Sequence, residues 1–392
     1  MPTQKIADFP LFAGKLKVTN LGNWTTGFNS NPGTGSPASN PATFTLDNGS
    51  WLYDSLLIVL EGDVVNSTTT GVTLNDKREI YDILRTISNV KGGDQNRYNT
   101  SGMMLYALEQ LFGGGIGTNV MSNDILPQAP SLTAGKFRLT WKVPFRNPAL
   151  KPDFLNLLNA YKGAGVESFY IQAVFGSAPV NFYTGDVGAS LSNLILRVSA
   201  FQYDYDNMAP IYTKSFAEKA VLPEFQPIEL GVNALQAAPG VYQNVQLNRL
   251  RLVSGLLIAA TTGANVGTPV EGAIQLVQTQ INQQEIQFKN MDVNDIAADN
   301  AAKLKTSLFL SGNDLDNFIY LNFCRDNELT QMINAVTYPN SAGVDVTQFL
   351  LMIQAQTACN LRILQLQEYV PNLSLIPIQQ KNPYMQMLTL VA

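Results

Sequence analysis

Histidine is absent from the sequence, and charged residues are few. Among 392 residues there are 25 Lys and Arg and 30 Asp and Glu, together 14 % of the chain, where an average soluble domain has about 25 %. Without histidine the chain cannot build a Ser-His-Asp triad, a Cys-His pair, a histidine general base or a histidine-ligated zinc site. The composition therefore excludes many of the commonest catalytic sites.

Cysteines and long apolar runs are equally scarce. Cys324 and Cys359 are the only cysteines, so we expect two buried free thiols rather than a disulfide framework. The first residues lack the basic and apolar regions of a secretory signal, and no apolar run reaches the roughly 18 residues of a spanning helix. We therefore expect a soluble protein made in the cytosol. Five Asn-x-Ser/Thr sequons are interpreted as chance matches: Asn23, Asn48, Asn66, Asn99 and Asn372.

Motifs that would carry chemistry are incomplete. Gly113–Thr118 reads GGGIGT and lacks both the Gly-Lys-Ser/Thr ending of a phosphate loop and the spacing of a dinucleotide loop, so we interpret it as a flexible turn. Three acidic clusters do not fit the twelve-residue calcium loop and are interpreted as turn acids or helix caps. They are Asp204 with Asp206, Asp292 with Asp295 and Asp299, and Asp314 with Asp316. We therefore predict no catalytic, cofactor-binding or metal-binding residue and no cofactor.

Side-chain amides are abundant where charges are not. The chain has 36 Asn and 25 Gln, and its net charge is −5 with the basic residues scattered. A nucleic-acid-binding protein gathers Lys and Arg on one face or arm, so we predict no direct sequence-specific binding of nucleic acid. Burying an amide against backbone groups costs less than burying a charge. The composition therefore favours extensive contact between subunits over a solitary monomer.

Apolar and polar residues alternate with period two in many segments. In Lys136–Val143 (KFRLTWKV), Phe137, Leu139, Trp141 and Val143 share one face, which is typical of a strand with one buried side. Similar patterns occur at 169–175, 194–199, 249–252, 351–356 and 364–367. Their outward amides and hydroxyls suit contact with water or with another subunit. Helical spacing of apolar residues predicts short helices at Pro152–Gly163 and Arg325–Val336.

The strands form two groups on either side of a proline-rich stretch. We predict an all-β fold with a few short helices, and about two or three domains for this length. The predicted parts are an N-terminal arm and loop (1–42), a first β unit (43–207), a connecting segment (208–240), a second β unit (241–372) and a C-terminal tail (373–392).

An ordered series of strings resembles the double jelly-roll major capsid proteins of tailless icosahedral, membrane-containing bacteriophages, of the tectivirus type, in the lineage of adenovirus hexon. The resemblance covers roughly Tyr53–Val370. It is carried by Tyr53–Val65 (YDSLLIVLEGDVV), Ile83–Gly93, Ser101–Phe112 (SGMMLYALEQLF), Lys136–Phe145 (KFRLTWKVPF), Phe154–Tyr161, Ser168–Phe175, Asn193–Tyr205 and Phe318–Gln331.

The resemblance implies two tandem eight-stranded jelly rolls and a structural, non-enzymatic role. It implies pseudo-hexagonal homotrimers that tile an icosahedral virion shell over an internal lipid membrane, after synthesis in the host cytoplasm. The partners would be further copies, neighbouring trimers, minor capsid or penton proteins and the viral membrane. From position and composition we expect contacts at the loops Asn29–Asn40 and Gly263–Gly272 and at the terminal segments Met1–Lys17 and Leu373–Ala392.

Two other functions remain open at this point. A carbohydrate-binding or adhesion protein built of two β-sandwiches would need exposed aromatic residues, and Trp24, Trp51 and Trp141 are the only tryptophans. A glycoside-active enzyme would need two carboxylates about 5 Å or about 6.5–9.5 Å apart. Thirty acidic residues give no basis for choosing such a pair.

Overall fold

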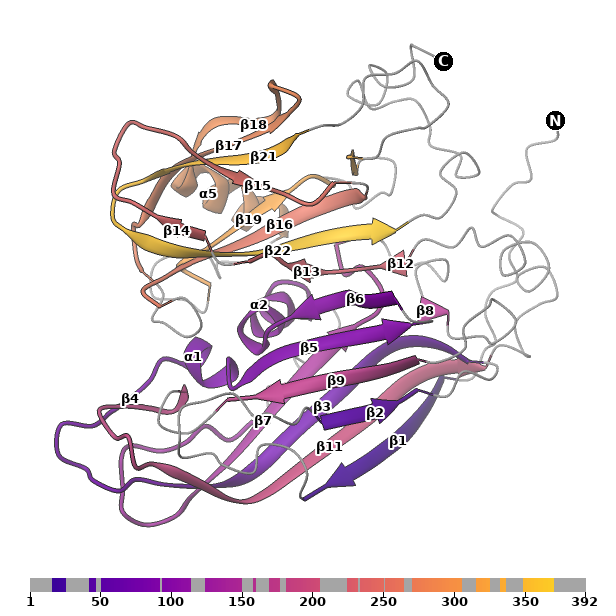
Figure 1. Ribbon diagram of the computed structural model, residues 1–392, viewed down its shortest axis with the longest axis vertical. Helices are drawn as coiled ribbons and strands as arrows, with labels where there is room; N and C mark the ends of the chain where they lie inside the picture. The colour runs from indigo at the N-terminus through magenta and orange to yellow at the C-terminus, as the bar shows by residue number, and fades with distance from the viewer. Residues whose placement is uncertain are drawn as a thin grey trace.

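The computed structural model contains two β units that lie one above the other. Figure 1 shows the N-terminal unit in indigo to magenta below and the C-terminal unit in orange to yellow above. The structure describes residues 16–25, 42–46, 51–91, 94–113, 124–149, 158–159, 169–176, 181–204, 224–231, 233–249, 251–263, 270–304, 315–324, 332–335 and 348–369.

The first unit is a sandwich of two antiparallel layers, each with four main strands among the described residues. One sheet has the order β1-β11-β3-β7 and the other has the order β2-β9-β5-β6. The strands are β1 (Leu16–Trp24), β2 (Ala42–Thr45), β3 (Trp51–Val65), β5 (Leu84–Lys91), β6 (Asp94–Thr100), β7 (Gly135–Pro144), β9 (Phe169–Phe175) and β11 (Ser190–Asp204). The first, eighth, third and sixth strands thus face the second, seventh, fourth and fifth, which is the strand arrangement of a jelly roll.

The second unit repeats this arrangement. The order β15-β21-β17-β18 forms one sheet, and β19-β16-β22 with β14 paired to β22 forms the other. The strands are β14 (Asn233–Leu235), β15 (Gln243–Gln246), β16 (Leu252–Thr261), β17 (Ile274–Ile281), β18 (Gln284–Asp292), β19 (Phe318–Asn322), β21 (Phe349–Ala355) and β22 (Cys359–Tyr369). The prediction of two tandem eight-stranded jelly rolls is therefore confirmed.

Period-two alternation places the cores as predicted. Phe137, Leu139, Trp141 and Val143 of β7 are buried in the core of the first jelly roll, and the indole of Trp141 donates to the Tyr81 carbonyl at 3.2 Å. The opposite face of β7 is less covered, apart from Thr140. Each jelly roll has its own apolar core, and the residues of the two cores come from two separate stretches of the sequence.

The two jelly rolls share one continuous sheet. β12 (Glu224–Phe225), β13 (Ile228–Glu229) and β14 all pair with β22, and β13 also pairs in parallel with β6 of the first jelly roll. The described part of the segment 208–240 therefore supplies strands that join the rolls. The remaining two-residue strands are β4 (Thr73–Leu74), which pairs with β10 (Tyr183–Thr184), β8 (Leu158–Asn159) and β20 (Ile333–Asn334).

Both predicted helices are wrong where the structure describes them. Within Pro152–Gly163, residues Leu158–Asn159 form β8 and pair with β3, and within Arg325–Val336, residues Ile333–Asn334 form β20 and pair with β16. Pairing with a neighbouring strand has overridden helical spacing at these positions.

The helices within the described residues are α1 (Lys77–Tyr81), α2 (Gly102–Phe112) and α5 (Val293–Leu304). None of the helices within the described ranges is long and apolar enough to cross a membrane.

Candidate functional site: the interface between the jelly rolls

The interface between the two jelly rolls is built around α2, which lies between the units in Figure 1. Nine of its eleven residues are buried. Leu105 and Tyr106 enter the core of the first jelly roll, and five others belong to a third apolar cluster, separate from the two jelly-roll cores. This cluster joins Met103, Met104, Ala107, Leu108 and Leu111 of α2 to Leu257, Ala259, Phe318, Tyr320, Leu364 and Leu366 of the second jelly roll. All ten residues of β16 are buried because one face of this strand enters the second core and the other meets α2.

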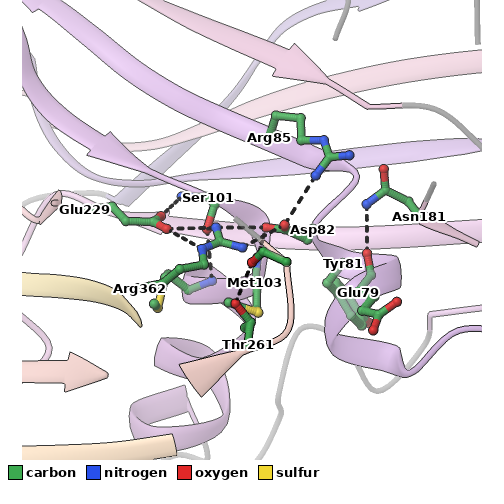
Figure 2. Close-up of polar contacts among 12 residues, drawn as sticks. Glu79, Tyr81, Asp82, Arg85, Ser101, Met103, Asn181, Glu229, Thr261 and Arg362 are labelled. Atoms are coloured by element: carbon green, nitrogen blue, oxygen red, sulfur yellow. Dashed lines mark hydrogen bonds and ion pairs between the residues drawn. The ribbon is translucent and has the colours of Figure 1, made fainter. Parts of the chain in front are cut away.

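Arg362 lies at the centre of a buried ion cluster at this interface (Figure 2). From β22, its Nη1 and Nη2 donate to the two carboxylate oxygens of Asp82 at 2.8 and 3.2 Å, and its Nε donates to Glu229 Oε1 at 2.8 Å. Asp82 belongs to the first jelly roll and Glu229 to β13. One guanidinium therefore ties together three parts of the chain, with the two-pronged geometry that arginine offers to carboxylates.

The same cluster holds the first turn of α2. Ser101 is the N-cap, and its hydroxyl accepts from the Met104 amide at 3.5 Å and from Arg362 Nη2 at 2.6 Å. Glu229 accepts from the Ser101 amide at 2.9 Å and Asp82 from the Met103 amide at 3.4 Å. Two carboxylates at a helix N-terminus are stabilised by its unpaired amides and its dipole.

A close approach of α2 to the rest of the first jelly roll requires glycine at position 102. A Cβ atom at this position would collide with the Tyr81 carbonyl oxygen and would lie 2.8 Å from the indole nitrogen of Trp141. The N-terminus of α2 is thereby seated against α1 and β7, beside the ion cluster.

Burial and charge act against each other in this cluster. Burial works against the charge of Arg362, but Glu229 and Asp82 more than offset it and raise the pKa of the guanidinium. Burial raises the pKa of the Asp82 carboxyl, and Arg362 and Arg85 oppose that shift. Arg362 thus stays charged, while Asp82 carries the cost of burial that its arginine partners must offset.

Two further polar contacts cross the interface. Arg78 of α1 donates to Asp316, just before β19, at 2.6 Å, and the buried Asn147 side chain donates to Ser254 of β16 at 2.9 Å. Arg78 also donates from its Nε to Asp76, the N-cap of α1, at 2.7 Å. The relative orientation of the jelly rolls is therefore set by apolar packing at the centre and directed polar contacts around it.

Three of the acidic residues considered from the sequence, and both cysteines, have an assigned structural environment. Asp292 caps α5 by accepting from the Asn294 amide at 2.8 Å, Asp299 pairs with Lys303, and Asp316 pairs with Arg78. Cys324 and Cys359 are free and buried, as predicted. No three His, Cys, Asp or Glu side chains in the described stretches form a group that could hold a metal ion.

The surfaces expected to make subunit contacts are only partly within the described residues. Asn29–Asn40, Leu373–Ala392 and most of Met1–Lys17 lie outside them, as does the middle of Gly263–Gly272. The amide face expected on β22 is used inside the chain, because Gln365 and Gln367 are buried. Gln365 exchanges two 3.0 Å hydrogen bonds with the backbone of Asn248.

Comparison with known proteins shows which solved structures share this fold. No family model matches the sequence, and no curated protein matches it. Among solved structures, the chain is similar to one from Sulfolobus turreted icosahedral virus (TM-score 0.62, 14 % identity, 96 % of this chain and 97 % of that chain covered). It is also similar to the crystal structure of the major capsid protein of that virus (0.61, 14 %, 91 % and 98 %) and to that of bacteriophage PM2 (0.50, 10 %, 91 % and 98 %). The chain therefore has the double jelly-roll fold of viral major capsid proteins, as its resemblance predicted.

Proposed function

We propose that this chain is the structural major capsid protein of an icosahedral virion and has no enzymatic activity. The observation that carries the proposal is the double jelly-roll fold, which aligns with viral major capsid proteins over at least nine-tenths of both chains. The buried interface supports it, because a tile of a closed shell needs its two jelly rolls at a fixed mutual orientation. Apolar packing and paired charges at α2 provide that rigidity.

We further propose that three copies assemble into a trimer of six jelly rolls with a pseudo-hexagonal outline, and that these trimers tile the shell over an internal membrane. Neighbouring trimers, minor capsid or penton proteins and the membrane are the proposed partners, without direct binding of nucleic acid. The boundaries at 207 and 372 are kept as part of the proposal. β1 (Leu16–Trp24), inside the expected arm 1–42, is assigned to the first jelly roll, and β14 (Asn233–Leu235), inside the expected connecting segment 208–240, is assigned to the second.

A carbohydrate-binding function is not favoured by the tryptophans. Trp141 is fully buried, and Trp24 packs against Phe44 with ring centroids 5.6 Å apart. The large apolar side chains that are exposed in the described residues are all aliphatic, whereas sugar-binding surfaces need aromatic faces.

The native mass of the purified full-length chain tests the proposal. Analytical ultracentrifugation should give a species of about three times the 42.8 kDa chain mass, and negative-stain images of source material should show hexagonal facets. A stable monomer at micromolar concentration with saturable glycan binding would contradict the capsid function.

A further inference from the structure

Three neighbouring loops form one end of the first jelly roll. They comprise residues 66–74 after β3, 130–134 before β7 and 184–189 before β11. Because β11, β3 and β7 are adjacent in one sheet, their loops lie side by side at the end of the sheet near β4 in Figure 1. We call this surface the three-loop end.

Hydrogen bonds between the loops hold the three-loop end in one arrangement. Asp186 accepts from the amides of Ser67, Thr68 and Gly188 at 2.7, 3.2 and 2.9 Å and from the Ser67 hydroxyl. Asn66 joins the third loop, since its amide donates to the Ser131 carbonyl at 3.3 Å and its side chain accepts from the Ser131 amide at 3.0 Å. Little further ordering would be needed on binding, which lowers its entropic cost.

The fixed loops expose aliphatic side chains and no charge. Val187 is 89 % exposed and Leu132 is 63 % exposed, the two highest values among the large apolar side chains of the described residues, and Leu74 is 39 % exposed. Asp186 is the one charged residue of the three loops, and it is only 2 % exposed. The surface that remains consists of methyl groups, hydroxyls and backbone.

The absence of exposed charge favours a second copy of this chain as the occupant. Two copies of a neutral surface can approach without like-charge repulsion and without desolvating ions. A lipid surface is a poorer match, because peripheral attachment combines inserted apolar residues with cations facing anionic headgroups, and these loops contain no Lys or Arg. We propose that the three-loop end is a contact surface for a second copy of this chain, with Val187 and Leu132 on its two flanking loops as the main apolar contacts. This inference rests on the proposed self-assembly and specifies one of its contacts.

Charge substitutions in the full-length chain test the contact. Val187→Asp and Leu132→Asp should each lower the yield of assembled particles at least tenfold, measured by sedimentation and negative-stain counting at equal concentration. Val241→Asp is the matched control, because Val241 is also a highly exposed valine (59 %) but lies in the second jelly roll. The Val241→Asp protein should assemble like the wild type. Circular dichroism and thermal melting should be the same for all four proteins.

The outcomes separate this contact from the proposed function. If both Val187→Asp and Leu132→Asp assemble as well as the wild type, the proposed contact is wrong and the proposed capsid function is unaffected. A wild type that never assembles would overturn the capsid function and the contact with it. Vesicles of phosphatidylcholine, alone or with phosphatidylserine, provide a further arm. Flotation that is lost in Val187→Asp and Leu132→Asp, with particle yield unchanged, would make lipid the occupant and overturn the proposal.

Discussion

The helices α2 and α5 occupy equivalent places in the two jelly rolls, each between the fifth and the sixth strand. Their surroundings differ. α2 buries nine of eleven residues, whereas α5 buries only Ile296 and Asn300 of its twelve. Their sequences match these surroundings: GMMLYALEQLF has one acidic residue and VNDIAADNAAKL has two acidic residues and one basic residue.

This difference shows how a tandem repeat becomes a single rigid unit. Both jelly rolls insert a helix at the same point. α2 buries most of its residues there, against β22 and β16, whereas α5 meets the interface cluster only through the partly buried Ala297 and Leu304. The same interface contains the buried Asp82 and Arg362 and the partly buried Glu229. The asymmetry between α2 and α5 is therefore the feature that joins two similar folds at one fixed orientation.

The largest expected effect comes from placing a charge on the two helices in turn. Ala107 of α2 is fully buried, so Ala107→Asp should lower the free energy of unfolding by about 5 kcal/mol, since the carboxylate has no partner there. Ala298 of α5 is exposed, and Ala298→Asp should cost about 1 kcal/mol or less, mostly helix propensity. Urea unfolding followed by circular dichroism measures both. Equal losses would show that the two helices are not in different environments.

Removing Arg362 tests the ion cluster beside α2. Arg362→Met removes the shared partner of the buried Asp82 and of Glu229, whose side chain is 12 % exposed, and should cost about 3–5 kcal/mol. Arg138→Met is the control, because the Arg138 side chain is 41 % exposed and its Nε lies 3.4 Å from Glu61; this exposed pair should contribute about 1 kcal/mol or less. Urea titrations should also show the Arg362→Met deficit shrinking in acid, because burial raises the pKa of the Asp82 carboxyl and acid neutralises it. A loss no larger than that of the control would contradict a structural role for the cluster.

Asp186 should make one end of the first jelly roll sensitive to acid. Burial opposes ionisation, but hydrogen bonds from Ser67, Thr68 and Gly188 lower the pKa of Asp186 from 3.8 to about 2. An acid whose pKa is lower in the folded state stabilises the fold above its unfolded pKa. Its contribution is therefore complete above about pH 4 and is lost as the pH falls toward 2.

Hydrogen exchange at the amides of residues 67 and 68 measures this loss directly. Protection relative to the intrinsic rate should fall between pH 4 and 2 in the wild type. Asp186→Asn should remove the pH dependence at a cost of about 1–2 kcal/mol. The corresponding end of the second jelly roll joins Gln356 to Gln275, which do not titrate, so protection there should stay constant. Parallel loss of protection in both rolls would assign the acid effect to global unfolding instead.

Strand identity was predictable from the sequence because alternation is a local property. Lys136–Val143 shows it within eight residues, and β7 buries the face that the alternation indicated. The helix α2 was not predicted. It is covered on nearly all sides, so its apolar residues form a continuous run rather than the one-sided stripe that marks an exposed helix. The two predicted helices were wrong because two-residue strands such as β8 and β20 are too short to produce a period-two pattern in the sequence.

The ion cluster could not have been predicted from the sequence. Asp82, Glu229 and Arg362 are separated by more than 100 residues each, and none stands in a recognisable spacing. They meet only because β13 lies between β6 and β22 in the shared sheet. Although the chain has few charged residues, several of them lie together in one network at the interface between the jelly rolls.

The turn between the fourth and the fifth strand offers the smallest test of the comparison between the rolls. In the first jelly roll, the two residues between the paired Lys91 and Asp94 are glycines. In the second, Asn282 and Gln283 fill the turn with φ of 48° and 69°, values that favour glycine in a two-residue hairpin turn.

Copying glycine into the second roll should therefore stabilise it. Gln283→Gly should raise the free energy of unfolding by about 0.5–1 kcal/mol, because relief of the left-handed backbone exceeds the entropy that glycine adds to the unfolded chain. Gln280→Gly, in the neighbouring strand β17, should lower it by a similar amount. Urea titrations of the two variants decide the matter. Opposite signs three residues apart would place the strain in the turn, whereas destabilisation by both would show that Gln283 contributes contacts that outweigh its backbone conformation.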